Sequence, residues 1–548
     1  TPQRVAEAWL NYTRTGTGMF WWGGEELSTE HRAFMNLKRG IPAPASGSMA
    51  CNGSVAAEQI GGQIFIDTWG LIWPGNPAKA AEYARIAASV SHDGEGLHGA
   101  AFIAACIAAA FTCTTVDEVL DAGLGELPED CEYRRVVTAV REFHAAHPGD
   151  FRACRDYVDR AWGYHKYPGY CHIIPNAGVC VLALLYGGGV LSRTIEIACM
   201  CAMDTDCNAS NTGTIVGVLG GLGPIPPKYR DPIHDAVVLS CVSGYLNILD
   251  GAAFSEELAC IAAALREEAL PTRFVPAKQG ELRFDFELPG ATHGLELSTE
   301  ATHRIRQTTD RAHTGTGSLA LFIDGKQPED ATLSFKAFYC RRDFNDERYS
   351  PVFSPRVYPG QTVSVWMYSE QLAPAAVTVV PYLTRALDDA QISFPPTVLP
   401  REQWTQVTFT IPDLMGDQVH DVGWAFHAAP EEDIYVFGTV YLDDISVTGP
   451  MDYTVEFRLQ RKEFGQVTPF SFNQCDGTVE NGRLLLTSQG EGQAFTGHYY
   501  MTDGFVEADV IPSEGASCAL LLRGQGCERY YTLGFEGENR VALVRHGY

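Results

Sequence analysis

Residues 95–112 read EGLHGAAFIAACIAAAFT, and this stretch decides the fold of the first half of the chain. Its apolar run from Ala100 to Phe111 is shorter than the roughly 18 to 20 apolar residues of a membrane span, so it predicts a buried helix. Small residues such as Gly99 and Ala104 point to close packing, because an interior helical glycine costs about 1 kcal/mol relative to alanine. We therefore expect an all-α core around this helix and no contact with a membrane.

On both sides of this stretch, apolar residues recur at helical spacing, from residue 1 to about 268. Thr1-Pro2 is typical of a helix start, with proline at the first helical position. Further helices are expected over Pro77–Ser89, Glu95–Thr112, Glu132–Ala145, Asn176–Tyr186, Ser192–Met200, Asn208–Leu222 and Phe254–Glu268. Gly213, Gly217, Gly220 and Gly221 in one of them indicate close helix packing or close approach of the backbone to a ligand.

The helical pattern ends at residues 269–281, which carry two prolines and no clear period. After them, apolar and polar residues alternate, as half-buried strands require. The alternation is clear at Leu282–Leu288, Val363–Met367, Val407–Ile411 and Tyr441–Val447, and later at Tyr453–Phe457, Leu484–Leu486, Val506–Val510 and Val541–Val544. We expect an all-α domain (1–268), a linker (269–281), an antiparallel β-sandwich (282–450) and a second β-sandwich (451–548) that stops directly after an apolar strand, as an incomplete domain would.

Composition narrows the function classes. The formal net charge of −27 argues against nucleic-acid binding, which needs lysine and arginine to neutralise phosphates. The sixteen cysteines form no CxxC pair, so a structural zinc protein is disfavoured. Cysteines inside apolar helical runs, such as Cys106 and Cys180, look like small core residues in a reducing compartment. That favours the cytoplasm, although the localisation stays open because a removed leader would leave no trace.

The run Met203-Asp204-Thr205-Asp206-Cys207-Asn208 links an apolar helix to the Gly-rich helix. Two carboxylates at positions i and i+2 of an extended loop point to one side, as oxygen ligands of a hard cation such as Mg²⁺ do. The alternative is that Asp206 or Asn208 only caps the next helix. Both interpretations can hold together, because a capping loop also exposes carboxylates.

Three other loops carry small polar residues. Ser91–Gly96 contains His92, which can donate a hydrogen bond or a proton near neutral pH, and Gly94, which allows close backbone approach. Taken alone, an Asp-Gly-Glu turn is more often a simple helix start. Gly47–Ser54 opens onto a helix whose N–H groups suit a phosphate, without the Gly-Lys-Ser/Thr of a Walker motif. His172 in Tyr170–Asn176 has no zinc partners nearby and is expected to be structural.

Taken in this order, the Gly-Ser…Asn-Gly-Ser loop, the Ser-His-Asp-Gly-Glu-Gly turn and Asp-Thr-Asp-Cys-Asn before a Gly-rich helix resemble the ADP-ribosylglycohydrolase family over about residues 1–260. The resemblance implies an all-α hydrolase with two Mg²⁺ or Mn²⁺ ions that cleaves the bond between ADP-ribose and a protein side chain or another acceptor. Asp204 and Asp206 would bind metal. Ser48, Asn52 and Gly53 would line the diphosphate or ribose site, and His92 and Gly94 would contact substrate.

Two departures from the family pattern bear on activity. The Thr-Asp-Asp metal-binding run has no counterpart before Asn52, and Cys207 stands where a threonine ligand is common. Two cations need more oxygen ligands than two aspartates supply, so we expect that a segment before Thr1 completes the site or that the chain is inactive. Candidates for the carboxylate that activates water are Asp93 and Glu95, with Glu26, Glu30 and Asp67 also available.

The sequence from 282 to 450 resembles the jelly-roll carbohydrate-binding modules of glycan-active enzymes, and the part from 453 resembles concanavalin-type sandwiches. These likenesses imply carbohydrate as a partner, with Tyr530, Tyr531 and Phe535 as candidate stacking residues, although aromatic residues at strand spacing are more often core. The first hypothesis is therefore a metal-dependent glycohydrolase acting on an ADP-ribosylated substrate or a glycoside. The second is a non-catalytic glycan-binding or scaffold protein with a degenerate helical domain.

Overall fold

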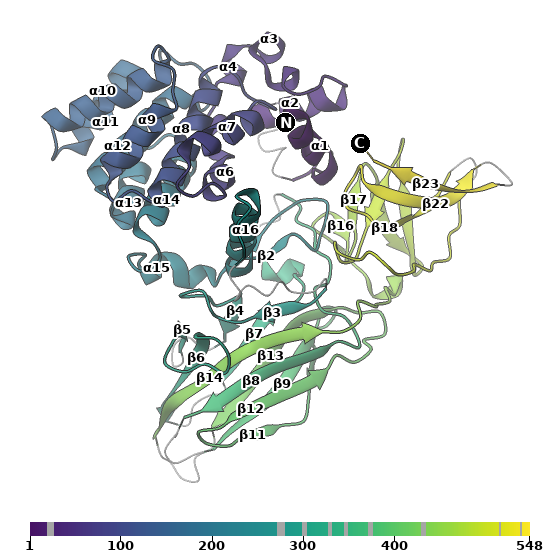
Figure 1. The fold of residues 1–548 in the computed structure, drawn as a ribbon. Coiled ribbons are helices and arrows are strands. Elements are labelled where there is room, and N and C mark those ends of the chain that lie inside the picture. Colours follow the sequence, from purple (N-terminus) through teal and green to yellow (C-terminus); the bar gives the residue numbers. More distant parts are fainter. Residues whose placement is uncertain are drawn as a thin grey trace. The chain divides into compact units, whose positions relative to one another are not determined.

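The structure is a computed structural model that describes residues 1–18, 27–270, 280–298, 304–326, 331–344, 349–370, 376–428, 435–513, 517–536 and 540–547 (Figure 1). It forms two compact units. The first comprises residues 1–10, 20–230 and 256–270, and the second comprises residues 11–19, 231–255 and 271–548. None of the described helices is both long and apolar enough to cross a membrane.

Helices build the first unit. They are α1 (Pro2–Tyr12), α2 (Thr29–Lys38), α3 (Met49–Asn52), α4 (Ser54–Ala57), α5 (Gly61–Ile64), α6 (Asp67–Leu71), α7 (Pro77–Ala88), α8 (Glu95–Ala110), α9 (Val116–Gly125), α10 (Glu132–Ala146), α11 (Phe151–Trp162), α12 (Ile173–Gly187), α13 (Leu191–Met200), α14 (Thr205–Gly220), α15 (Pro227–Arg230) and α16 (Gly251–Leu265). Local sequence explains several ends. The Asn76 side chain caps α7 ahead of Pro77, and α12 ends at Gly188 with φ 59°. All seven helices expected above are present, and so is the helix starting at Pro2.

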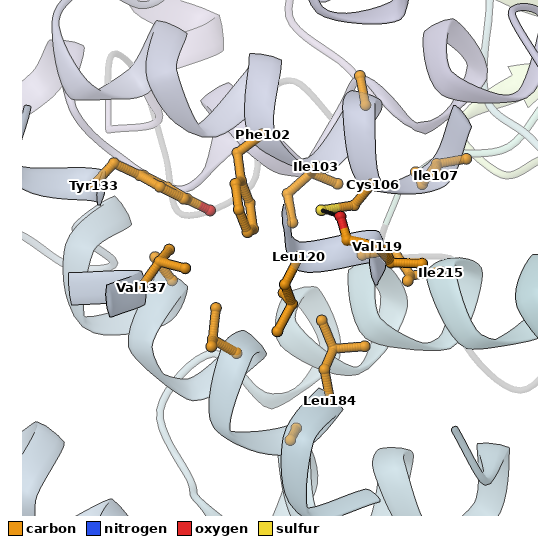
Figure 2. Close-up of a cluster of buried hydrophobic side chains, with 14 of the residues drawn as sticks. Phe102, Ile103, Cys106, Ile107, Val119, Leu120, Tyr133, Val137, Leu184 and Ile215 are labelled. Atoms are coloured by element: carbon orange, nitrogen blue, oxygen red, sulfur yellow. Dashed lines mark hydrogen bonds between the residues drawn. The ribbon is translucent and has the colours of Figure 1, made fainter. Parts of the chain in front are cut away.

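Helix α8 is the centre of this unit, as residues 95–112 predict. Its residues from Ala100 to Ala110 are all buried. Figure 2 shows Phe102, Ile103, Cys106 and Ile107 of α8 among Val119 and Leu120 of α9, Tyr133 and Val137 of α10, Leu184 of α12 and Ile215 of α14. A Cβ atom on Gly99 would clash with Ile173 and lie 2.9 Å from Cε2 of Tyr133, so this glycine permits close helix packing.

The glycines of α14 behave differently from the expectation. A Cβ on Gly217 would meet no described atom within 4 Å, and those on Gly213 and Gly220 would make ordinary contacts at 3.6 and 3.7 Å. Close helix packing does not explain them. Close helix packing is therefore right for α8 and wrong for α14, for which the alternative, close approach of the backbone to a ligand, stays a prediction.

The second unit contains the expected antiparallel β-sandwich. One sheet has the order β10-β9-β13-β7-β4, with β11 also on β9; the other has the order β12-β8-β14-β6-β5, with β3 on β14. The strands are β3 (Leu282–Phe284), β4 (Leu295–Leu297), β5 (Arg304–Thr308), β6 (Ser318–Lys326), β7 (Ala331–Lys336), β8 (Thr362–Ser369), β9 (Val377–Arg385), β10 (Gln391–Ser393), β11 (Thr397–Leu399), β12 (Trp404–Thr410), β13 (Val419–Ala428) and β14 (Tyr435–Thr448). Alternate residues of both sheets, among them Val365, Leu442 and Trp424, form one buried core.

Residues 451–548 are also all-β, as expected, but they form small sheets. These pair β15 (Lys462–Glu463) with β16 (Gln466–Val467), β17 (Ser471–Asn473) with β20 (Gln493–Phe495), β18 (Asp476–Glu480) with β19 (Arg483–Thr487), and β21 (Ala519–Leu522), β22 (Tyr530–Glu536) and β23 (Arg540–His546) with one another. The strand predicted at Val506–Val510 is absent, since these residues are exposed and pair with no described strand. Phe457 likewise begins a short 3-10 helix.

A short hairpin interrupts the region expected to be all-helical. Strands β1 (Ala236–Val238) and β2 (Ile248–Asp250) pair with each other and belong to the second unit. There, Asp250 accepts a 2.7 Å hydrogen bond from Nδ1 of His293. All sixteen cysteines of the chain are free thiols.

Candidate functional site

The loop between α13 and α14 holds Asp204 in an unusual backbone conformation. Ala202, Met203 and Asp204 have φ angles of 55°, 60° and 51°, so three consecutive residues other than glycine are left-handed. Each such residue costs roughly 1 kcal/mol or more, and strained backbone of this kind concentrates at functional sites. Asp204 stands at the N-cap of α14, yet its side chain makes no capping hydrogen bond.

Three potential ligands meet at this loop. Ligand atoms of Asp204, Asp206 and Cys207 lie within 4.8 Å of one another. Oδ2 of Asp204 is buried and has no hydrogen-bond partner among the described residues. Burial raises the pKa of Asp204 above its ordinary value, and the negative charge of Asp206 adds to that effect. An unpaired buried carboxylate oxygen is costly unless a cation or a proton compensates it.

Asn208 fixes this loop from the first turn of α14. Its Nδ2 donates to the carbonyl of Met203 at 3.1 Å and to Oδ1 of Asn176 at 2.9 Å. Asn208 is fully buried, and Asp206 lies inside the helix and not at its cap. Capping by Asp206 or Asn208 therefore does not explain the motif, and the carboxylates of Asp204 and Asp206 stay free of that role.

A buried polar network lies along α14 behind the loop. Oδ1 of Asp67 accepts a hydrogen bond from Asn211 at 3.0 Å, and Oδ2 accepts one from Thr214 at 2.7 Å. Gln63 joins the network by donating to Asn211 at 3.3 Å and accepting from the Tyr133 hydroxyl at 2.8 Å. Burial raises the pKa of Asp67 to about 6 against these hydrogen bonds. Through these two hydrogen bonds, Asp67 of α6 holds α14 against α6.

The turn at residues 91–96 buries His92 next to Glu30. The Ser91 hydroxyl lies 2.7 Å from Nδ1 of His92, and Nε2 of His92 lies 3.5 Å from Oε1 of Glu30. Burial lowers the pKa of His92 to about 3 and raises that of Glu30 to about 7, so Glu30 and not His92 gains or loses a proton close to neutral pH. A Cβ on Gly61 would clash with Glu30 and lie 2.8 Å from Cε1 of His92.

The other predicted substrate residues make local structural contacts. Ser48 caps α3 by accepting from Cys51 N at 3.3 Å, and Asn52 links Asn36 and Ser46 by hydrogen bonds of 2.9 and 2.8 Å. Gly53 and Gly94 have φ angles of 81° and 56°, which glycine adopts without strain. Their predicted contact with substrate stays a prediction, and these bonds show what else the residues do.

The two carboxylates favoured as catalytic candidates are also engaged. Asp93 accepts from the backbone N–H of Met49 at 3.1 Å and of Gly94 at 2.8 Å. Glu95 accepts from the N–H groups of Glu132 and Tyr133 at 3.0 and 2.9 Å and thereby caps α10. Glu26 lies outside the described residues. Glu30 differs from Asp93 and Glu95, because among the described residues its buried carboxylate accepts no backbone N–H group from another helix.

Residues that sequence reasoning did not single out lie nearby. The pKa of Cys171 is raised to about 12 by burial and by the charges of Asp204 and Glu30. Nε2 of His172 lies 3.6 Å from Oε2 of Glu58, and the adjoining segments pair at Gln59 and His172. His172 is buried, and it was expected to be structural. No spacing pattern in the sequence identifies Cys171 or Glu58 as residues of this region.

The donor set at the Asp204 loop fits a divalent cation in part. Carboxylate oxygens suit Mg²⁺ or Mn²⁺, and the unpartnered Oδ2 of Asp204 is the oxygen a cation would compensate. The Cys207 thiol does not suit Mg²⁺, and burial with the neighbouring Asp204 raises its pKa far above the ordinary value. Within the described residues this cluster supplies two carboxylates, which is fewer oxygens than a pair of ions needs.

The comparisons with known proteins match different parts of the chain. No curated protein matches it. Among solved structures, a carbohydrate-binding module of the β-sandwich superfamily is 22% identical over 30% of this chain and 61% of that chain, with a TM-score of 0.24. The xylan-binding CBM22-2 domain of Paenibacillus barcinonensis Xyn10C is 14% identical over 31% and 99% (TM-score 0.23), and the C-terminal family 22 module of Clostridium thermocellum Xyn10B is 14% identical over 32% and 96% (TM-score 0.22).

The helical region is matched by a family profile, that of the ADP-ribosylglycohydrolases, over residues 1–268. This range contains the strained Asp204 loop, the His92 turn and the α8 core described above. Residues 1–268 of this chain therefore belong to the ADP-ribosylglycohydrolase family.

Proposed function

We propose that the helical region is a metal-dependent hydrolase that cleaves an ADP-ribosyl bond or a related N- or O-glycosidic bond. The observation that carries the proposal is Asp204, which combines a left-handed backbone with a buried carboxylate oxygen lacking any partner in the described structure. With Asp206 it presents two carboxylates from one loop. Family membership supports a glycohydrolase in general, and the substrate class is our proposal.

Asp204 and Asp206 would hold the metal, which we propose to be Mg²⁺ or Mn²⁺, with two ions in the complete site. Such ions supply Lewis acidity and a template for the ribose hydroxyls when they are bound. The chain's own residues would do the rest. Asn208 and Asn176 keep the loop in place, and the buried network around Asp67 fixes α14 behind it.

Glu30 is the carboxylate that we propose as the proton acceptor for water. Its pKa near 7 matches the requirement that a general base titrate close to the working pH. The charges of both Glu30 and Asp204 raise the pKa of Cys171, which supports a common site for the proposed base and the proposed metal ligands. His92 would orient Glu30, since its Nδ1 is already engaged with Ser91.

Hydrolysis measured on the full chain tests the proposal. The substrates are O-linked and N-linked ADP-ribosyl conjugates and a panel of simple glycosides, each with Mg²⁺, Mn²⁺ or a chelator. We expect metal-dependent release of ADP-ribose, reduced about 100-fold or more in Asp204→Asn, because a metal at the reacting centre contributes several kcal/mol. Glu129→Gln, an exposed loop change, is the control. Turnover that is equal with and without chelator would refute metal dependence.

A second function, carbohydrate binding by the β-sandwich, rests on an aromatic cluster. His313 stacks on Trp366 with ring centroids 4.0 Å apart and meets Trp404 edge-on at 5.4 Å. Trp366 and Trp404 remain partly exposed on neighbouring strands β8 and β12. Tyr530 is buried against His546 and is no platform, whereas Phe535 is exposed. Affinity electrophoresis in soluble polysaccharides should show retardation that Trp366→Ala abolishes, and no retardation would leave the sandwich as scaffold.

A further inference from the structure

The described residues contain three places where three side chains drawn from histidine, cysteine, aspartate and glutamate converge. One is the Asp204 cluster. A second, Cys340 with Asp343 and His420, already contains a cation, because Nζ of Lys336 lies 3.0 Å from Asp343 and 3.2 Å from His420. The third consists of Glu95, His98 and Cys131, whose ligand atoms lie within 4.8 Å of one another.

We propose that Glu95, His98 and Cys131 form a binding site for one borderline transition-metal ion, of which Zn²⁺ fits best. Imidazole nitrogen, thiolate sulfur and carboxylate oxygen are the three ligand types that Zn²⁺ takes in proteins, whereas Mg²⁺ and Ca²⁺ take oxygen. The two anionic ligands offset the charge of the ion. The sequence has no CxxC motif, and this set is assembled only by the fold, from residues 36 positions apart at its widest.

Two helix starts preorganise the ligands. Glu95 and His98 lie at i and i+3 in the first turn of α8, with Nδ1 of His98 3.2 Å from Oε2 of Glu95. Cys131 is the N-cap of α10, and its sulfur accepts from the N–H of Arg134 at 3.4 Å. N–H groups that bond metal-binding carboxylates and thiolates act as outer-shell partners, which strengthen metal sites.

Capping alone does not explain the cluster. It accounts for Glu95, which receives two N–H groups of α10, and for Cys131. It does not account for His98, which ends no helix and turns its Nδ1 toward both of them. In the described part of the chain Glu95 forms its ion pair with His98 and with no lysine or arginine.

The site is also accessible. The side chains of His98 and Glu95 are 25% and 16% exposed, so an ion can enter and a water molecule can complete four ligands. On binding, the thiol proton of Cys131 and the imidazolium proton of His98 pass to solvent, because the pKa of His98 is raised to about 9, and the freed sulfur and nitrogen bond the ion. The ion would tie the start of α8 to the start of α10 and thus stabilise the core shown in Figure 2. This role is independent of the proposed hydrolysis.

Metal binding to the full chain tests the proposal. Protein stripped with a chelator is titrated with Zn²⁺ against a chromophoric chelator, and with Co²⁺ to detect the sulfur-to-cobalt charge-transfer band. Cys131→Ser is the informative variant, because serine is itself a good N-cap and should preserve the fold. His98→Gln removes the nitrogen ligand. Cys207→Ser and Cys199→Ser are matched controls, one in the Asp204 cluster and one exposed on α13.

We expect one cysteine-bound ion per chain in the wild type and in both controls, with the charge-transfer band present. Cys131→Ser should lose the band, and both it and His98→Gln should bind Zn²⁺ at least about 100-fold more weakly, since even outer-shell changes cost 10- to 100-fold. Zn²⁺ should raise the Tm of the wild type and not that of Cys131→Ser. A band that survives in Cys131→Ser, or that disappears in Cys207→Ser, would overturn the proposal. So would a wild-type protein that binds no Zn²⁺.

Discussion

Nε2 of His92 lies 3.5 Å from Oε1 of Glu30, and both side chains are buried in the helical unit. Burial disfavours a charge on either side chain, so Glu30 gives up its proton only as the pH rises through about 7, while His92 stays neutral. The pair thereby provides a titratable proton inside the helical unit. Its behaviour is open to direct measurement.

The substitution Glu30→Gln should alter how stability depends on pH. Folding raises the pKa of Glu30 from its ordinary 4.5 to about 7. A carboxyl whose pKa is raised stabilises the fold fully below pH 4.5 and loses that contribution as the pH rises through 7. Relative to the variant, the wild type should therefore lose on the order of 3 kcal/mol between pH 4.5 and 8.

Urea unfolding followed by circular dichroism at both pH values measures this difference. The opposing titration of His92 cancels in the comparison, because both proteins contain it. Glu129→Gln, in an exposed loop, should show no such trend. A stability difference between wild type and Glu30→Gln that is independent of pH would show that folding does not raise the pKa of Glu30.

Gly61→Ala should destabilise the helical unit. The new methyl group would clash with the carboxylate of Glu30 and crowd the His92 ring, and both side chains are buried. Overpacking of this kind costs about 1–3 kcal/mol. Gly217→Ala is the matched control, since its Cβ meets no described atom within 4 Å and alanine favours a helix by up to about 1 kcal/mol. Equal unfolding midpoints for the two variants would contradict the packing at Gly61.

Asp204→Asn should keep or raise the stability of the metal-free protein while abolishing metal binding. Asparagine tolerates the left-handed backbone at this position, and a neutral amide removes the unpaired buried carboxylate oxygen. The free energy of unfolding in chelator and the heat of Mn²⁺ binding measure the two effects. A variant that unfolds more readily and still binds Mn²⁺ would assign Asp204 a structural role.

Cys207→Thr should shift metal preference at the Asp204 cluster toward Mg²⁺. The hydroxyl group replaces a soft sulfur by a hard oxygen within the same ligand cluster. Calorimetric titration should show tighter Mg²⁺ binding than in the wild type, with Cys199→Thr on the exposed end of α13 unchanged. Unaltered Mg²⁺ affinity in Cys207→Thr would place the thiol outside the coordination sphere.

The sequence predicts the helical core because periodicity and small residues are strong local signals. Helix α8 is identified from its length and its alanines, and α14 from the apolar positions that follow Asp206. The sequence does not predict helices α2, α9 and α11. Their apolar residues are interrupted by charge, as in Phe151–Trp162, and their starts depend on caps such as Thr115 that are meaningful only once the helix is known.

The candidate site is predictable where it lies in one segment and not where it is assembled. Asp204 and Asp206 share a loop and are visible as a motif. Glu30 and His92 are 62 positions apart, and their pairing depends on Gly61 lying between them without a side chain. Spacing rules hold no information about such a contact, because it arises from how α2, α5 and the turn before α8 pack.

Because the β1–β2 hairpin belongs to the second unit, the boundary of the family match differs from the boundaries of the compact units. Residues 11–18 and 231–255 fall inside the family match, yet their partners lie far along the chain. The Asn11 amide bonds the carbonyl of Gln525, Asn247 bonds that of Val352, and Asp250 bonds His293. A fragment that ends at residue 268 would leave these polar groups without their partners. An expression boundary chosen from sequence similarity would therefore divide the second unit, and its parts would be prone to aggregate.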